Sequence, residues 1–219
     1  MKIKWFGHAC FIITSENGTK ILTDPYNNMA DYKLPEIEAD IVSTSHGHSD
    51  HNNIKAVKSS FVHISETGVF SEHGIEINGV ETFHDNVLGA IKGKNTIYNF
   101  KIDETNICHC GDLGHILSSK QIEQIGKVDI LLLPVGGGFT INAIDAVKVM
   151  KQLNPTVVIP MHYRTKALGL MGHLFEKVDK FISASALKSK EYAELELNKA
   201  TIKDHSGIAV LKYDHTNYK

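Results

Sequence analysis

Cysteine is scarce in this chain, and the cysteines present are not spaced for disulfide bonds. Cys10, Cys108 and Cys110 are an odd number, and two of them are separated by a single residue. Secreted domains that depend on disulfides carry cysteines in larger, even numbers. The sequence therefore argues against a disulfide framework and favours a reducing compartment.

Long apolar runs and an excess of one charge are also missing. Near the N-terminus the longest apolar run covers residues 9–13, which is too short for a signal peptide or a membrane span. The chain has 23 lysines and arginines against 25 aspartates and glutamates, with a formal net charge of −2. Dedicated nucleic-acid binders carry a basic patch, so nucleic acid is not an expected partner. We expect a cytoplasmic protein without a membrane segment.

Proline is rare as well, with 5 residues in a chain of 219, and 42% of the residues are hydrophobic. This composition excludes disordered, collagen-like and coiled-coil proteins. The length permits a sizeable core, and the chain contains no linker or internal repeat. We therefore predict a single domain over residues 1–219.

The first half of the chain reads as mostly strand. Strands are predicted over residues 2–6, 11–14, 20–23, 40–44 and 61–65. The dipeptide Asn17-Gly18 predicts a hairpin turn, and residues 53–58 favour a short helix.

The second half alternates between strand and helix. Strands are predicted over residues 106–110, 129–133, 156–160 and 207–213, and helices over 118–125, 141–153 and 174–183. Such alternation is typical of βαβ units and of the α/β class with mixed sheets. Residues 164–174 contain two glycines and are predicted to form a flexible loop.

Histidine is abundant, with 13 residues, and three lie together in His46-Gly47-His48-Ser49-Asp50-His51, directly after a predicted strand. Imidazole nitrogens and carboxylate oxygens all need partners when they are packed so densely. On a tight turn His46 and His48 can point one way, and Asp50 and His51 towards a neighbouring site. The spacing favours two metal ions over the alternative, a solvated loop rich in histidine.

The motif His-x-His-x-Asp-His at a strand end resembles that of the metallo-β-lactamase fold hydrolases. Three later segments match further positions of the family pattern: Glu81-Thr82-Phe83-His84-Asp85, Cys110-Gly111-Asp112-Leu113-Gly114 and Ile159-Pro160-Met161-His162-Tyr163. The resemblance covers nearly the whole chain. It implies a four-layer αββα sandwich of two mixed β-sheets flanked by helices.

The same resemblance implies a set of ligands for two divalent metal ions. His46, His48 and His84 would hold the first ion, Asp50, His51 and His162 the second, and Asp112 would bridge them. Asp85 is expected to brace His84. Histidines outside the pattern are expected to be ordinary residues: His63, His73, His109, His205 and His215.

The activity implied by the resemblance is hydrolysis of a small lactone, ester, amide or phosphodiester. Zinc suits the ligand types best, and manganese or iron also fits. Two such ions produce a bridging hydroxide at neutral pH, and Asp50 and Asp112 would orient it or move its proton. Two alternatives on the same fold stay open: a di-iron redox or oxygen-handling protein, and a non-catalytic metal-binding scaffold.

The opening segments Lys4-Trp5-Phe6-Gly7-His8-Ala9-Cys10-Phe11 and Ile21-Leu22-Thr23-Asp24-Pro25 resemble a small bacterial branch related to L-ascorbate 6-phosphate lactonase and N-acyl phosphatidylethanolamine phospholipase D. In that branch His8 lies near the site, beside substrate or a ligand; a plain turn histidine is the alternative. Asp24 is expected to brace a ligand histidine, and His115 to contact substrate. Arg164 would meet an anionic group of the substrate if residues 164–174 act as a lid. A homo-oligomer stays open.

Overall fold

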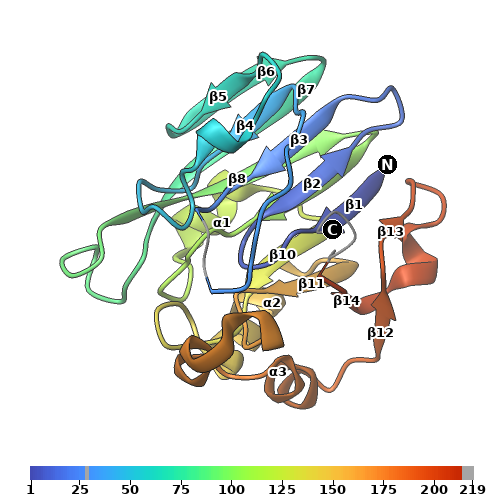
Figure 1. Cartoon of the computed structure of the whole chain (residues 1–219). Coiled ribbons are helices and arrows are strands. Elements are labelled where there is room, and N and C mark those ends of the chain that lie inside the picture. Colours follow the sequence, from blue (N-terminus) through green and yellow to red (C-terminus); the bar gives the residue numbers. More distant parts are fainter. Residues whose placement is uncertain (28–29, 214–219) are drawn as a thin grey trace.

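The structure is a computed structural model and describes residues 1–27 and 30–213. Two mixed β-sheets form its centre (Figure 1). The first sheet has six strands in the order β13 (Leu195–Glu196), β1 (Lys2–Trp5), β2 (Phe11–Thr14), β3 (Lys20–Thr23), β4 (Ile41–Ser43) and β5 (Val62–Ile64). Pairing is antiparallel from β13 to β3 and parallel from β3 to β5.

The second sheet has eight strands. Their order is β12 (Ser189–Tyr192), β14 (Gly207–Leu211), β11 (Val157–Met161), β10 (Ile130–Pro134), β9 (Thr105–His109), β8 (Lys94–Ile102), β7 (Ile75–Phe83) and β6 (Gly68–Glu72). Strands β6 to β9 pair antiparallel, and β9, β10, β11, β14 and β12 pair parallel. The α/β class with two mixed sheets and helices, predicted from the sequence, is confirmed.

Alternation of side chains along the first sheet builds two cores. Phe11, Ile13 and Ile21 point inward and share one core with the second sheet. Their neighbours Ile12 and Leu22 point outward into a smaller core. Both sets are apolar because both faces of the sheet are covered. Each large side chain buried in this way contributes about 1.5–3 kcal/mol.

Three α-helices, α1 (Ser119–Ile125), α2 (Ala143–Leu153) and α3 (Val178–Ser185), accompany the second sheet. α1 lies against β7 and β8, and α2 lies against β10 and α3 (Figure 1). The outward core of the first sheet is instead completed by loop residues such as Tyr26 and Tyr32, and by Leu168 from a 3-10 segment. No helix in the described ranges is long and apolar enough to cross a membrane.

Three local predictions differ from the structure. The helix expected over residues 53–58 is only a 3-10 turn, Ile54–Ala56. The flexible loop expected over 164–174 forms 3-10 turns, Lys166–Leu174, broken at Gly169 where φ is 52° and anchored by buried Leu168. The helix expected over 174–183 is α3, which begins only at Val178. The last 3-10 segment is Ile202–His205.

Candidate metal centre

The segments rich in histidine and aspartate follow strands of both sheets, and the ends of these strands lie close together. Parallel strands β3 and β4 end just before Asp24 and the motif at residues 46–51. Parallel strands β9 and β11, on either side of β10, end just before Asp112 and His162. Carboxyl ends of parallel strands meet at one edge of a sheet, and ligand sites of α/β proteins form there. The two sheets therefore bring two sets of polar strand ends face to face.

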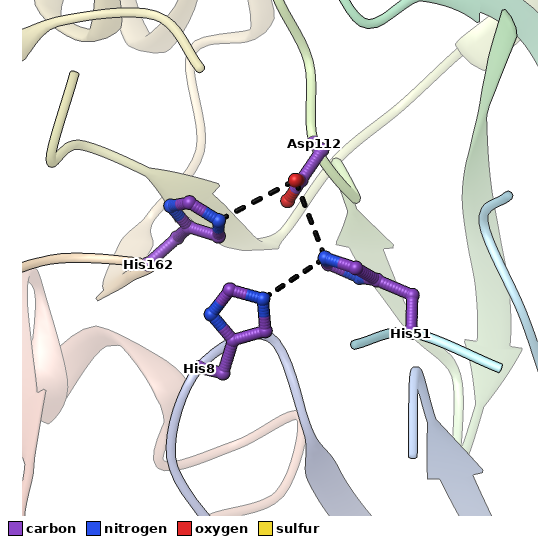
Figure 2. A group of neighbouring side chains, drawn as sticks. All are labelled: His8, His51, Asp112 and His162. Carbon is purple, nitrogen blue, oxygen red and sulfur yellow. Dashed lines mark hydrogen bonds and ion pairs between the residues drawn. The ribbon is translucent and has the colours of Figure 1, made fainter. Parts of the chain in front are cut away.

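One group of donors, the buried cluster, consists of His8, His51, Asp112 and His162 (Figure 2). Each side chain offers one donor atom, and these atoms all lie within 4.8 Å of one another. Asp112 Oδ2 lies 3.2 Å from His51 Nε2 and 3.4 Å from His162 Nε2. All four residues are buried. Four convergent donors of these types suit a divalent metal ion.

The second group, the outer cluster, consists of His46, His48 and His84. His46 Nε2 lies 3.0 Å from His48 Nδ1. His84 is buried, whereas His46 is half-buried and His48 is exposed. The outer cluster therefore has three imidazole donors and lies nearer to solvent than the buried cluster.

Asp112 joins the two clusters. Its Oδ2 atom also lies 3.1 Å from His84 Nε2, so one carboxylate oxygen contacts imidazoles of both groups. Its Oδ1 atom and the Nδ1 atoms of His84 and His162 are buried and have no hydrogen-bond partner among the described residues. Two donors on one tetrahedral zinc ion lie about 3.3 Å apart, as its bond lengths of about 2.0–2.1 Å require. The observed contacts of Asp112 fit that spacing, and its orphaned oxygen leaves room for a cation.

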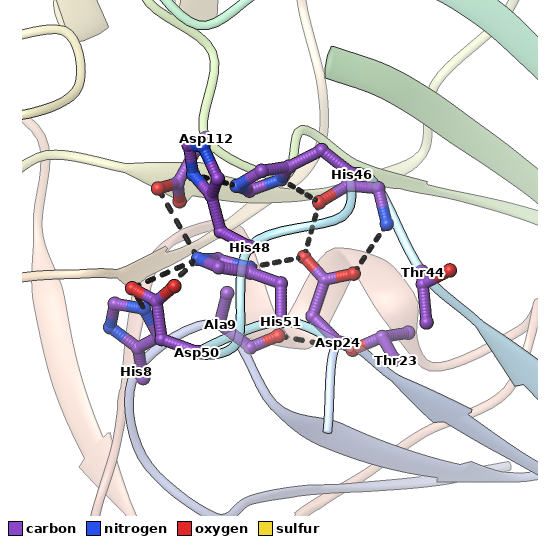
Figure 3. A network of polar contacts seen from close by, with 12 residues as sticks. His8, Ala9, Thr23, Asp24, Thr44, His46, His48, Asp50, His51 and Asp112 are labelled. Carbon is purple, nitrogen blue, oxygen red and sulfur yellow. Dashed lines mark hydrogen bonds and ion pairs between the residues drawn. The ribbon is translucent and has the colours of Figure 1, made fainter. Parts of the chain in front are cut away.

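Asp24 braces a histidine of each cluster (Figure 3). Its Oδ2 atom lies 2.8 Å from His51 Nδ1 and also accepts the Ser45 hydroxyl at 2.6 Å. That hydroxyl lies 2.9 Å from His46 Nδ1 and can accept its proton. Protons fixed on the Nδ1 atoms leave the Nε2 lone pairs of both rings directed into the clusters. The expected bracing role of Asp24 thus has a geometric basis.

The electrostatics of the clusters follow from burial and the two carboxylates. Burial disfavours the charged form of His51, but the Asp112 and Asp24 carboxylates raise its pKa well above the usual value. Burial, aided by His162, lowers the pKa of His8 to about 4. Burial, aided by His51, lowers the pKa of His46 to about 3. His8 and His46 are therefore neutral at pH 7, as metal ligands must be, whereas His51 would release a proton when a metal ion binds.

Backbone strain is concentrated at the same place. His8, Asp24 and His162 have φ of 51°, 39° and 52°, in the left-handed region. Each such residue other than glycine costs about 1–3 kcal/mol. Gly111 has φ of 53°, and an added Cβ would lie 2.5 Å from Ser45 Cβ. Glycine before Asp112 thus lets β9 approach the segment that carries the histidine motif.

A cleft of about 600 Å³ opens beside the outer cluster, and His46 and His48 line it. Its other walls are polar and come from β5, β7, β8 and the segments next to them: Ser45, Gly47, Ser65, Glu66, Thr67, Glu81, Lys92, Gly93, Lys94 and Thr96. Lys94 is paired with Glu81, with 2.6 Å between Nζ and Oε2. The cleft therefore offers hydroxyls and charged groups to a polar molecule.

Asp50 lies at the solvent side of the buried cluster, with 39% of its side chain exposed. Its Oδ2 atom lies 3.4 Å from His8 Nε2 and 3.9 Å from His51 Nε2. Burial opposes ionisation, but the hydrogen bond to His8 and the charge of His51 lower the pKa of Asp50. His8 Nε2, at 3.0 Å from His51 Nε2, is closer to that histidine than Asp50, which the family pattern places beside it.

Asp85 does not brace His84. Its two oxygens accept hydrogen bonds from the backbone N–H groups of Val87, Gly89, Ile91 and Lys92, at 2.8–3.0 Å. Although burial opposes it, these four donors hold the pKa of Asp85 well below its usual range. Asp85 therefore organises the loop that follows His84.

His115 and Arg164 have local partners. His115 Nε2 accepts the Phe83 N–H at 3.1 Å, and its Nδ1 lies 2.8 Å from the Ile116 carbonyl oxygen. Arg164 Nη2 lies 3.2 Å from the ring nitrogens of His173 on the following 3-10 segment. Neither residue belongs to the two clusters of donors.

Of the remaining histidines, His109 is fully buried and lies 2.8 Å from the Ala9 carbonyl through Nε2. Its Nδ1 accepts the Gly111 N–H. His63 contacts Thr44, and His205 contacts Tyr192. His73 lies in the turn before β7, with φ of 51°. His215 lies outside the described residues.

Known proteins resemble the chain over most of its length. Residues 2–162 match the family model described as β-lactamase superfamily domain. The chain is 32% identical over 198 residues to a UPF0173 metal-dependent hydrolase from Pelotomaculum thermopropionicum, a match that covers 75% of this chain and 85% of that protein.

Solved structures agree with these matches. The chain is similar to a candidate zinc-dependent hydrolase of the metallo-β-lactamase superfamily from Thermotoga maritima, with a TM-score of 0.80 and 37% identity over 96% of this chain and 97% of the other. It is also similar to CmlA, a diiron β-hydroxylase from Streptomyces venezuelae, with a TM-score of 0.61 and 17% identity over 97% of this chain and 52% of the other. The likeness to CmlA shows the fold alone. The likeness to the Thermotoga maritima structure confirms the predicted sandwich.

Proposed function

The chain belongs to the β-lactamase superfamily, and from this premise we propose that it is a metal-dependent hydrolase whose centre consists of the buried and outer clusters. One observation carries the proposal. A single oxygen, Asp112 Oδ2, lies within 3.1–3.4 Å of three imidazole nitrogens that belong to both clusters. A carboxylate so placed needs positive charge, and a pair of metal ions beside it would supply that charge.

The residues fit two divalent ions. His46, His48 and His84 would hold one ion, and His51 and His162 the other, with Asp112 between them. Such ions, when bound, supply a water of lowered pKa and polarise the oxygen of the bond to be cleaved. Zinc suits this set of imidazoles and carboxylates, and manganese or iron suits it too.

The protein's own groups position this chemistry. Asp24 holds a proton on His51 Nδ1 directly and, through the Ser45 hydroxyl, on His46 Nδ1. Both rings are thereby locked with Nε2 towards the centre. Asp50, ionised and half-exposed at the mouth, can accept a hydrogen bond from the attacking water and orient it.

The substrate would enter through the cleft beside the outer cluster. Ser65, Thr67 and Thr96 offer hydroxyls there, and Lys92 and Glu66 offer charges. A pocket of about 600 Å³ has the size of sites for small molecules. We therefore propose a small polar substrate with a lactone, ester, amide or phosphodiester bond.

The test combines metal content with turnover. The protein would be stripped with chelator, reloaded with Zn²⁺ or Mn²⁺, and assayed against p-nitrophenyl acetate, a γ-lactone, an anilide and bis-p-nitrophenyl phosphate. We expect turnover that disappears on stripping, returns on reloading, and falls by about 10³-fold in Asp112→Asn, because both ions lose their shared ligand.

Stripping and Asp112→Asn that both leave turnover unchanged would contradict the proposal. Two further outcomes would favour the other functions on this fold. An iron-loaded protein with the absorption of a coupled di-iron pair and no hydrolysis would indicate redox chemistry. Stoichiometric metal with no turnover of any of the four bond types would indicate a binding scaffold.

A further inference from the structure

His8 reaches the buried cluster from a distant part of the chain. It lies in the turn between β1 and β2, whereas His51, Asp112 and His162 follow β4, β9 and β11. Its Nε2 atom nevertheless lies 3.0 Å from His51 Nε2 (Figure 2). The His8 ring also lies 4.2 Å, centroid to centroid, from the ring of His162. The turn thus delivers a fourth donor to the group.

The fold spends free energy to hold His8 there. Its side chain is 3% exposed, and removing an imidazole from water has a desolvation cost. Its φ of 51° adds backbone strain. The His8 carbonyl oxygen accepts hydrogen bonds from Trp5 Nε1 and from the backbone N–H of His162, both at 3.1 Å. The hydrogen bond from His162 therefore joins the turn to the end of β11, next to another residue of the buried cluster.

The spacing around His8 Nε2 is that of donors on a common ion. Ligand atoms on one tetrahedral zinc ion lie about 3.3 Å apart. His8 Nε2 lies 3.0 Å from His51 Nε2 and 3.4 Å from Asp50 Oδ2. Asp24 accepts a hydrogen bond from the other nitrogen of His51, so a cation that displaces the proton shared by the two Nε2 atoms can bind both of them.

We propose that His8 is a ligand of the metal ion in the buried cluster, together with His51, His162 and Asp112. This inference rests on the proposed function, because it presumes that the clusters bind metal. Asp50 then stands at the exposed side of the same ion as a further donor.

An asymmetry between the two ions follows. The ion in the buried cluster has three imidazoles and one or two carboxylates, all but Asp50 buried. The ion in the outer cluster has three imidazoles and shares Asp112, and its ligand His48 is exposed. We therefore expect an ion in the buried cluster to bind more tightly than one in the outer cluster, which lies beside the cleft.

Binding measurements on the full chain separate the two sites. Metal-stripped protein would be titrated with Zn²⁺ against a chromophoric chelator, and the dissociation constants of the two bound ions would be compared. We expect His8→Ala to weaken the tighter ion about tenfold to a hundredfold and the weaker ion less than about threefold. His48→Ala should do the reverse. His205→Ala, a histidine that contacts Tyr192 instead, is the matched control and should change neither.

The possible failures are distinguishable. A wild-type protein that binds no stoichiometric Zn²⁺ overturns the proposed function itself. Two ions bound with wild-type affinities in His8→Ala, beside a weakened His48→Ala, overturn the assignment of His8 and leave the proposed function standing. Far-UV circular dichroism and thermal unfolding of each variant show whether a lost ion reflects a lost fold.

A second measurement uses only the wild-type protein. In wild-type protein labelled with ¹⁵N-histidine, one equivalent of Zn²⁺ should move the Nε2 resonances of His8, His51 and His162 to the range of coordinated nitrogens and leave those of the outer cluster unchanged. A His8 Nε2 resonance that does not respond to two equivalents of Zn²⁺ overturns the assignment.

Discussion

The buried and outer clusters share Asp112 but are built differently. The buried cluster draws its residues from four separate segments, two of them with backbone in the left-handed region, and all are shielded from solvent. The outer cluster takes two of its three histidines from one motif, in which a single residue separates them, and it lies beside the cleft. If both clusters bind metal as proposed, the buried cluster would hold its ion away from solvent, and the outer cluster would present its ion to the cleft.

The largest expected effect comes from the residue that the clusters share. Asp112→Ala removes the oxygen that contacts His51, His84 and His162. The three imidazoles then face one another without a carboxylate between them. We expect both ions to be lost and turnover to fall by about 10³-fold or more. Elemental analysis and steady-state kinetics check this. Retention of two ions in the variant would show that the clusters are independent.

A smaller effect is expected from the residue that braces both clusters. Asp24→Asn keeps the shape of the side chain but removes the charge that fixes His51 Nδ1 and, through Ser45, His46 Nδ1. We expect both metal affinities to fall by about 10–100-fold.

Asp129→Asn is a matched control for Asp24→Asn. Asp129 is also a buried carboxylate that accepts backbone and side-chain hydrogen bonds, from Asn106, but it is not a member of either cluster. Chelator competition should show unchanged metal affinities in this variant. Equal losses in both variants would indicate a general effect of removing a buried charge.

The loop beside the outer cluster gives a pH test. Four backbone hydrogen bonds depress the pKa of Asp85 in the folded protein. The ionised carboxylate therefore stabilises the loop fully at pH values above its ordinary pKa of about 3.9. This stabilisation is lost only as the pH falls through the lower pKa of the folded state. The backbone amides of Val87 and Gly89 should therefore remain protected from hydrogen exchange at pH 4. Asp85→Asn should accelerate exchange of the loop amides about tenfold. Loss of wild-type protection already near pH 5 would contradict this account.

The smallest effect is expected at His115. Both of its ring nitrogens have partners within the segments next to it, the Phe83 N–H and the Ile116 carbonyl. His115→Ala should change metal affinity and KM by less than about threefold, a change within the range of ordinary surface substitutions. A large rise in KM with unchanged metal content would indicate that His115 contacts the substrate.

The sequence predicts the strands and residue types of the centre better than it predicts their partners. The motif at residues 46–51, with Asp112 and His162 at later strand ends, is visible because polar residues follow apolar strands. Adjacency in the sequence predicts that Asp85 contacts His84, and this prediction is wrong. The Asp85 oxygens instead accept hydrogen bonds from the loop that follows. The role of His8 depends on a turn with positive φ and on its contacts with His162, which follows a strand of the other sheet, and neither feature leaves a pattern in the sequence.

The same limit applies to parts of the fold. β12 (Ser189–Tyr192) and β13 (Leu195–Glu196) are short, and β12 is largely exposed, so they carry little hydrophobic periodicity. The segment 53–58 has helix-forming residues but supports only a 3-10 turn. Strands with both faces buried, such as β10 and β11, are continuous apolar runs and are predicted well.

The number of metal ions held by the purified, metal-reconstituted chain shows whether the two clusters form a metal centre. Elemental mass spectrometry with a parallel protein assay gives the number of ions per folded chain. We expect about two divalent ions per chain, released by chelator in two separate steps. A folded protein that holds no stoichiometric zinc, manganese or iron after reconstitution would contradict this expectation.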